Sequence, residues 1–214
     1  MFNFFKKFKK DKKLNRGMTY VELIVVLSIF AVMSSIVLFN YGKFQAKVDI
    51  KNLANDIALK IVQAQKDAMS GKLPIQTPVE PWRPSYGVYF DLASNSKEFI
   101  YFTNTIDSNN NSYDDNTCIL PPTTDGGECL DQINITKNDY ISRIDSYLGS
   151  ADTQINTPLS ITFTRPNSGA AFSYTGSDIP RDYVQITVSS SDNSAKECIR
   201  VYPSGRIQIS ECPV

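Results

Sequence analysis

The sequence LIVVLSIFAVMSSIVLF, residues 23–39, contains no charged side chain and decides how the chain begins to fold. Together with residues 18–22 it forms a run of 22 residues with a single charge. A helix of that length extends over about 33 Å, and a bilayer core is about 30 Å thick. We therefore predict a transmembrane helix over residues 18–39. A buried core helix is the alternative, but the lysines directly before the run favour the membrane.

The segment before this run is strongly basic. Residues 1–17 carry seven basic side chains and one acidic side chain, a net charge of +6. The positive-inside rule predicts that this end stays in the cytoplasm and that everything after residue 40 lies outside. Two other interpretations are a nucleic-acid patch and an arm lying on the membrane surface. The basic residues are Lys6, Lys7, Lys9, Lys10, Lys12, Lys13 and Arg16.

The candidate processing signal lies before the apolar run. A secretory signal peptide would have an A-x-A-like cleavage site after the apolar run. Residues 39–47 read FNYGKFQAK and show no such site. The basic segment ends instead at Gly17, inside the junction RGMTYVE of residues 16–22.

The string RGMTYVELIVVLSI, residues 16–29, resembles the processing signal of type IV prepilins and type II secretion pseudopilins. This resemblance implies that a prepilin peptidase cuts between Gly17 and Met18, removes the leader 1–17, and N-methylates Met18. The family usually has Phe where Met18 stands and Thr where Tyr20 stands. Both departures leave the glycine and the glutamate in place.

Glu22 needs a partner or a function, because a carboxylate inside a bilayer costs about 2.5 to 3.5 kcal/mol or more. It could snorkel to the headgroups, since it lies near the helix end. Cleavage would also create an α-amino group at Met18, four residues away. The resemblance implies that Glu22 neutralises the terminal amine of an adjacent subunit during filament assembly, which a low dielectric favours.

Residues 40–72 continue the helical pattern as an amphipathic stem. Apolar side chains recur at steps of three and four, and lysines occupy the other faces. Gly71 and Pro74 supply a stop, so we predict one helix over residues 18–70. A coiled coil is one interpretation, and a spine for the following domain is the favoured one. The apolar positions are Ile50, Leu53, Ile57, Ile61, Ala64 and Ala68.

Residues 73–214 form the predicted head, which has a net charge of −8. Short alternating runs between polar turns predict antiparallel sheet, and hence an α+β fold with the N-terminal helix packed on the sheet. Segments such as YGVYFD at 86–91 and GRIQI at 205–209 resemble the heads of H-type pseudopilins and FimT-like minor pilins. The predicted strands are 86–92, 98–103, 160–165, 170–174, 183–189, 197–202 and 206–210.

The head contains all four cysteines, Cys118, Cys129, Cys198 and Cys212. An even number in one region indicates disulfides and an oxidising compartment, with three pairings open. The spacing favours Cys118 with Cys129, closing a small loop, and Cys198 with Cys212, clamping the last hairpin.

One polar segment of the head resembles the first part of a calcium loop, with oxygen donors at alternate positions. Ser112 replaces the turn glycine, and Cys118 stands where a bidentate glutamate is needed. A solvated turn is the favoured interpretation, although pseudopilins include calcium binders. The candidate calcium ligands are Asp107, Asn109, Asn111, Asp114 and Asp115.

The composition argues against an enzyme and against a nucleic-acid partner. The chain has no histidine, which excludes Ser-His-Asp and Cys-His catalysis and histidine zinc sites. We therefore expect no cofactor other than calcium. Phosphate binding needs clustered positive charge, but the head is acidic, and its arginines are expected to pair with Asp178, Asp182 and Glu197. Those arginines are Arg165, Arg181, Arg200 and Arg206.

The sequence therefore predicts a single-pass protein of the cytoplasmic (inner) membrane that serves as a structural filament subunit, a pilin or pseudopilin, with an exported head. The expected partners are other pilin or pseudopilin subunits, prepilin peptidase, the inner-membrane assembly platform and membrane lipid. An exported binding or adhesion domain that never polymerises, calcium-dependent or not, is the alternative. The chain's zero formal charge is the sum of a +6 leader and a mature part of −6.

Overall fold

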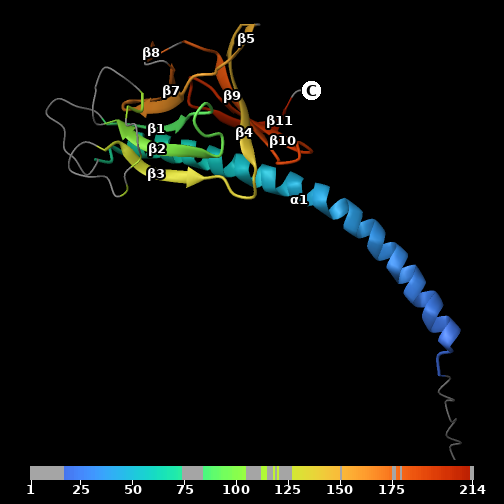
Figure 1. Cartoon of the computed structure of the whole chain (residues 1–214). Helices are drawn as coiled ribbons and strands as arrows, with labels where there is room; N and C mark the ends of the chain where they lie inside the picture. Colours follow the sequence, from blue (N-terminus) through green and yellow to red (C-terminus); the bar gives the residue numbers. More distant parts are fainter. Residues whose placement is uncertain are drawn as a thin grey trace, which may run out of the picture. The chain divides into compact units, whose positions relative to one another are not determined.

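The computed structural model describes residues 17–73, 84–104, 112–114, 118, 120, 127–149, 151–174, 177–178 and 180–212. The chain divides into an N-terminal unit, Met1–Gly42, and a head unit, Lys43–Val214. Helix α1, Tyr20–Ser70, contributes its first half to one unit and its second half to the other. Together with two antiparallel sheets, it gives the predicted α+β layout (Figure 1).

The first sheet of the head unit has the strand order β3-β2-β1-β6-β7-β8. All of its neighbouring strands pair antiparallel, with β1 near the middle between β2 and β6. The strands are β1 (Ser85–Phe90), β2 (Glu98–Asn104), β3 (Cys129–Asn134), β6 (Leu159–Thr164), β7 (Asn167–Tyr174) and β8 (Ser177–Asp178).

The second sheet has the order β11-β10-β9-β4-β5 and is also antiparallel throughout. Its edge at β11 is formed by the C-terminal hairpin. The strands are β4 (Tyr140–Leu148), β5 (Ala151–Gln154), β9 (Tyr183–Ser189), β10 (Lys196–Val201) and β11 (Ile207–Glu211).

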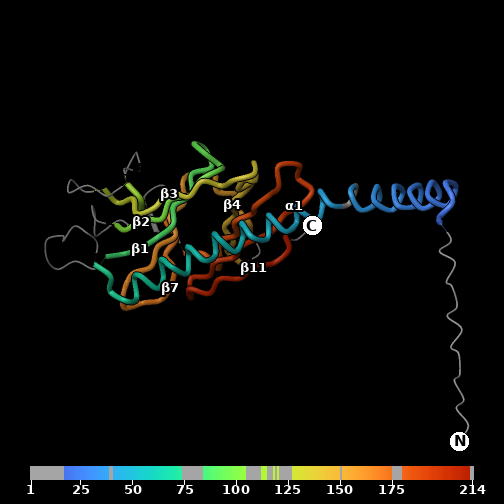
Figure 2. The backbone as a smooth tube through the Cα atoms, turned by 90° about the horizontal axis from the view of Figure 1, so that it is seen from below, coloured from blue at the N-terminus to red at the C-terminus, as the bar shows by residue number. Residues whose placement is uncertain are grey.

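The second half of α1 packs against both sheets and closes one hydrophobic core. Its apolar side chains at steps of three and four are fully or almost fully buried, as the sequence pattern predicts. Small alanines among them let the helix approach the strands, which Figure 2 shows it crossing. The buried helix residues are Ile50, Ala54, Ile57, Ala58, Ile61, Ala64 and Ala68.

Polar contacts also fix the helix on the head. Lys60 Nζ lies 2.7 Å from Oδ2 of Asp131 on β3, and Lys137 Nζ lies 2.7 Å from Oδ1 of Asp49. The side-chain amide of Gln65 donates a 2.8 Å hydrogen bond to the backbone oxygen of Ser168. These contacts are spread along the helix, so they define its register against the strands.

Helix α1 ends as the sequence predicts, at Ser70. Gly71 has a φ of 67°, a left-handed conformation that glycine adopts without strain. The Gly71 N–H donates to the oxygen of Ala68, and the Lys72 N–H donates to the oxygen of Asp67. This pair of bonds is a Schellman motif, which satisfies the last carbonyl groups of the helix.

Candidate processing and assembly site

The bond between Gly17 and Met18 lies outside the helix. Residues 17–19 have no regular secondary structure and are exposed, and α1 begins only at Tyr20. Among the described residues, no atom would lie within 4 Å of a side chain added at Gly17. The backbone at this bond is therefore exposed and outside the hydrogen-bonded helix.

Thr19 and Glu22 cap the start of the helix reciprocally. The Glu22 backbone N–H donates a 3.3 Å hydrogen bond to Oγ1 of Thr19. In return, Oε2 of Glu22 accepts bonds from the Thr19 backbone N–H at 2.8 Å and from its hydroxyl at 2.9 Å. This is a capping box, which satisfies N–H groups that the first turn of a helix leaves without partners.

The capping box uses only one oxygen of the Glu22 carboxylate. In the part of the chain that the structure describes, Oε1 of Glu22 has no hydrogen-bond partner. Gly17, Met18, Thr19, Glu22 and Val26 together line an open surface hollow. The second carboxylate oxygen is therefore available to a cation that approaches from outside the chain.

The first half of α1 presents an uncovered apolar surface on all sides. The large apolar side chains from Leu23 to Leu38 expose between 45% and 72% of their surface. Within the described ranges, α1 is the one helix long and apolar enough to cross a membrane. A continuous apolar surface of this size is not typical of a monomer in water.

The head contains two disulfides, which join sequence neighbours. Cys118 pairs with Cys129, and Cys198 pairs with Cys212, with Cα atoms 5.2 Å and 5.0 Å apart. The second bridge joins β10 to the residue directly after β11. It therefore closes the edge of the second sheet covalently.

Most of the candidate calcium loop lies outside the described residues, namely Asp107, Asn109, Asn111 and Asp115. Of the five candidate ligands, the structure describes Asp114, whose backbone N–H donates a 2.8 Å hydrogen bond to Oε2 of the buried Glu128. The described residues contain no group of three His, Cys, Asp or Glu side chains placed to hold a metal.

Arginines of the head stack on tyrosines. The Arg206 guanidinium carbon lies 3.9 Å from the ring centre of Tyr202, a distance at which a cation is attracted to the ring face. The predicted ion pairs with Asp182 and Glu197 are wrong, because neither acid has an ion pair within the described residues. Arg200 likewise lies over the ring of Tyr183, whereas Arg181 donates a hydrogen bond to the hydroxyl of Tyr174.

The capping role of Thr19 is the part of this site that sequence reasoning missed. The signal was present, because Thr-x-x-Glu directly before an apolar run is the pattern of a capping box. It assigns Glu22 a structural role in addition to any role in assembly. No family model, curated protein or solved structure matches the chain.

Proposed function

We propose that this chain is a non-enzymatic, membrane-anchored subunit of a type IV pilus or a type II secretion pseudopilus. The observation that carries the proposal is the environment of Glu22. This carboxylate lies in the first turn of an uncovered apolar helix, with one oxygen used in the cap and the other without a partner in the described residues. Inside a membrane, a charge in an apolar helix is retained where it has a function.

Processing creates a partner for the second oxygen of the Glu22 carboxylate. Prepilin peptidase hydrolyses the exposed bond after Gly17, leaving a carboxylate on Gly17 and an α-amino group on Met18. The same enzyme then transfers a methyl group from a methyl donor to that nitrogen, which gives up a proton. The Thr19 N–H and hydroxyl stay in the mature chain, so the capping box survives cleavage.

Assembly follows from charge pairing in a low dielectric. The Met18 ammonium of one subunit approaches Oε1 of Glu22 in its neighbour, and the attraction between two opposite charges is much stronger inside a membrane than in water. The apolar surfaces of the two helices then cover each other. The head, with its disulfides, faces the oxidising side of the cytoplasmic membrane.

The first test is the mass of the mature N-terminus, isolated from cells that contain prepilin peptidase. We expect a chain that begins at N-methylated Met18. A Gly17→Ala variant is expected to keep its leader, because the peptidase requires glycine at this place in the family that the sequence resembles. A wild-type chain with an intact leader would contradict the proposal and favour a single-pass binding domain.

The second test separates the two roles of Glu22. Glu22→Gln keeps an acceptor for the Thr19 N–H, because glutamine also serves in a capping box, but it removes the charge. Thr19→Ala removes the hydroxyl that caps the Glu22 N–H and keeps the charge of Glu22. We expect Glu22→Gln to abolish incorporation into filaments while the helix still begins at Tyr20.

The Thr19→Ala variant is the matched control. It is expected to lose about 1 kcal/mol of helix stability and still enter filaments. If Glu22→Gln assembled normally, or if Thr19→Ala failed to the same extent, the charge of Glu22 would have no role in assembly.

A further inference from the structure

The outer face of the second half of α1 carries large apolar side chains that no described part of the head covers. Phe44 and Leu59 expose 65% and 66% of their surface, and Val62 and Met69 expose 44% and 40%. Figure 2 shows this half of the helix in front of the strands, with no described element over its near side. Exposed apolar side chains that gather on one face indicate an interaction site.

These side chains form a stripe along the helix. Residues three, four or seven positions apart lie on the same face of an α-helix. Leu59, Val62 and Met69 follow one another at steps of three and seven, and Lys66 lies on the same face between the last two. The buried helix residues lie away from this face, against the core. We call the set the outer stripe: Phe44, Val48, Leu59, Val62 and Met69.

Lipid cannot cover most of the outer stripe. The apolar run of the sequence ends at residue 39, and Leu59 comes 20 residues later. At 1.5 Å per residue this is about 30 Å of helix, as much as the thickness of a bilayer core. With the membrane anchor that we propose, Leu59, Val62 and Met69 therefore lie beyond the lipid, and only protein can shield them from water.

Copies of this chain held in one membrane meet with equal residues at equal height. The basic segment stays on the same side of the bilayer in every copy, so the helices run parallel. The apolar first half of a second copy cannot reach Leu59 in this arrangement, because that copy would have to move outward by about 30 Å. The surface that meets the outer stripe is therefore the stem of the second copy, which carries the same stripe.

We propose that two membrane-anchored copies of this chain pair side by side through their outer stripes. Leu59 and Val62 of each copy lie against the same residues of the other copy, as in a short parallel coiled coil. The proposal rests on the membrane anchor of the proposed function and not on filament assembly.

The pair is weak by design of the sequence. A stable interface takes about 20–30 residues from each side, so the five side chains of the outer stripe pair two copies only where the membrane holds them together. The two Lys66 ammonium groups also face each other, and a lysine inside such a seam lowers its stability. We therefore expect a reversible pair that releases its subunits.

The test is disulfide cross-linking of a Val62→Cys variant of the full chain, reconstituted in lipid vesicles and oxidised with copper phenanthroline. The four native cysteines are already paired in two disulfides. We expect a covalent dimer on non-reducing gels. Asp56→Cys is the matched control, because Asp56 is exposed and lies six positions away, about 120° around the helix. It is expected to give about tenfold less dimer, because a disulfide forms only where two Cα atoms come within about 7 Å.

Two further changes in the Val62→Cys chain test the chemistry of the stripe. Leu59→Glu places like charges opposite each other and is expected to lower the yield of dimer about tenfold. Lys66→Leu removes a repulsion and extends the apolar seam, so it is expected to speed cross-linking. Neither Leu59 nor Lys66 is buried, and an unchanged unfolding temperature confirms that the head stays folded.

Three results would overturn the pairing: equal yields from Val62→Cys and Asp56→Cys, no loss of yield with Leu59→Glu, or a different partner for the stripe. The last is detected by mixing Val62→Cys chains with Met33→Cys chains. A disulfide between these two variants in place of the Val62→Cys dimer would mean that a displaced copy covers the stripe with its membrane half.

Flotation of the vesicles separates this proposal from the proposed function. A chain that does not float with the lipid would contradict the membrane anchor and the pairing together. A chain that floats but gives no Val62→Cys dimer would overturn the pairing alone. Glu22→Gln, which is expected to abolish filament assembly, is expected to leave the Val62→Cys cross-link intact.

Discussion

The hydroxyl of Tyr101 donates a 2.6 Å hydrogen bond to Oδ2 of Asp67 and so joins β2 to the last turns of α1. The same oxygen lies 2.8 Å from Nζ of Lys72. Tyr101 exposes only 3% of its surface, so water cannot replace the bond. This contact holds the end of the helix on the first sheet.

Replacing Tyr101 by Phe is expected to lower the free energy of unfolding by about 1.5–3 kcal/mol, because a buried hydrogen bond to a charged group is lost. Denaturant titration measures the change. Tyr140→Phe is the control, because its hydroxyl bond to Asn193 is exposed and its loss should cost much less. Equal costs for the two variants would mean that the Asp67 contact adds no stability of its own.

Stability in acid should depend on Asp67. Burial raises the pKa of this carboxyl, but hydrogen bonds from Lys72 and Tyr101 and the charge of Lys72 outweigh it, and the net pKa lies below its ordinary value. A lowered pKa means that the stabilisation is present above the ordinary Asp pKa of about 3.9 and is lost as pH falls through the folded value. Unfolding free energies measured below about pH 4 should therefore fall less steeply in Asp67→Asn than in the wild type. If the unfolding free energy fell equally steeply with pH in Asp67→Asn and in the wild type, Asp67 would not contribute to the acid sensitivity.

Tyrosines with restricted access to water should ionise late in an alkaline titration. Burial raises the pKa of Tyr89 to about 12, with a smaller contribution from Asp91. Burial and the bond to Asp67 raise the pKa of Tyr101 further. For a raised pKa the stabilisation is complete below about pH 10 and declines as pH rises toward the folded value. Tyrosinate absorbance should show a step near pH 12 that is missing in Tyr89→Phe.

Much of the fold could be predicted because its signals are local. The end of α1 at Gly71 and the alternation in β9 both depend on residues next to one another in sequence. Strand β4 was missed because its pairing with β9 shifts between Ile141 and Arg143, which breaks the alternation that marks a strand. Strand β3 was missed because it is a polar edge strand, and its Asp131 pairs with Lys60 on α1, which lies far away in the sequence.

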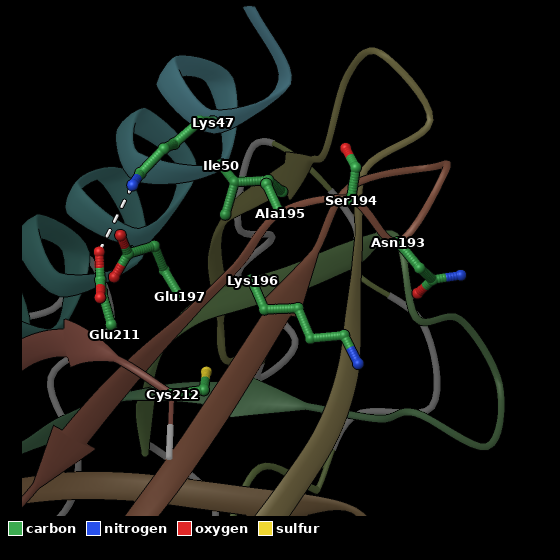
Figure 3. A pocket seen from close by; sticks show the side chains of 9 residues that line it. All are labelled: Lys47, Ile50, Asn193, Ser194, Ala195, Lys196, Glu197, Glu211 and Cys212. Carbon is green, nitrogen blue, oxygen red and sulfur yellow. Dashed lines mark hydrogen bonds and ion pairs between the residues drawn. The ribbon is translucent and has the colours of Figure 1, made fainter. Parts of the chain in front are cut away.

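The candidate sites also differ in whether neighbouring residues in the sequence could indicate them. The junction at Gly17 and the carboxylate of Glu22 are adjacent in sequence, so a pattern can indicate them. The pocket lined by Lys47, Glu197 and Glu211, in contrast, combines residues from α1, β10 and β11 and forms only when those elements pack (Figure 3). Sequence alone predicted an arginine partner for Glu197 within the chain, and the structure places its carboxylate toward the helix instead.

Two glycines should respond in opposite ways to alanine. A Cβ at Gly87, in the central strand β1, would lie 2.7 Å from the backbone oxygen of Ile161 and 2.8 Å from the ring of Phe102. Moving backbone atoms costs more free energy than moving the end of a side chain, so Gly87→Ala should destabilise the head by about 1–3 kcal/mol. A Cβ at the helical Gly42 meets no described atom within 4 Å, and Gly42→Ala should stabilise the helix by about 0.5–1 kcal/mol. If the unfolding temperature shifted in the same direction in both variants, this steric explanation would be wrong.

The Cys198–Cys212 disulfide should protect the last strand more than any other. It closes a loop with a sequence separation of 14, and loops of this size contribute about 3 kcal/mol by restricting the unfolded chain. It also ties down β11, an edge strand that is mostly half-buried or exposed and would otherwise fray. Replacing both cysteines by alanine should therefore speed amide exchange in Ile207–Glu211 more than in the inner strand β9. The control removes Cys118 and Cys129, whose bridge has a similar sequence separation of 11 and ends on β3 in the other sheet, and should leave exchange in β11 unchanged. Equal acceleration of β9 and β11 would mean that the bridge stabilises the head only globally.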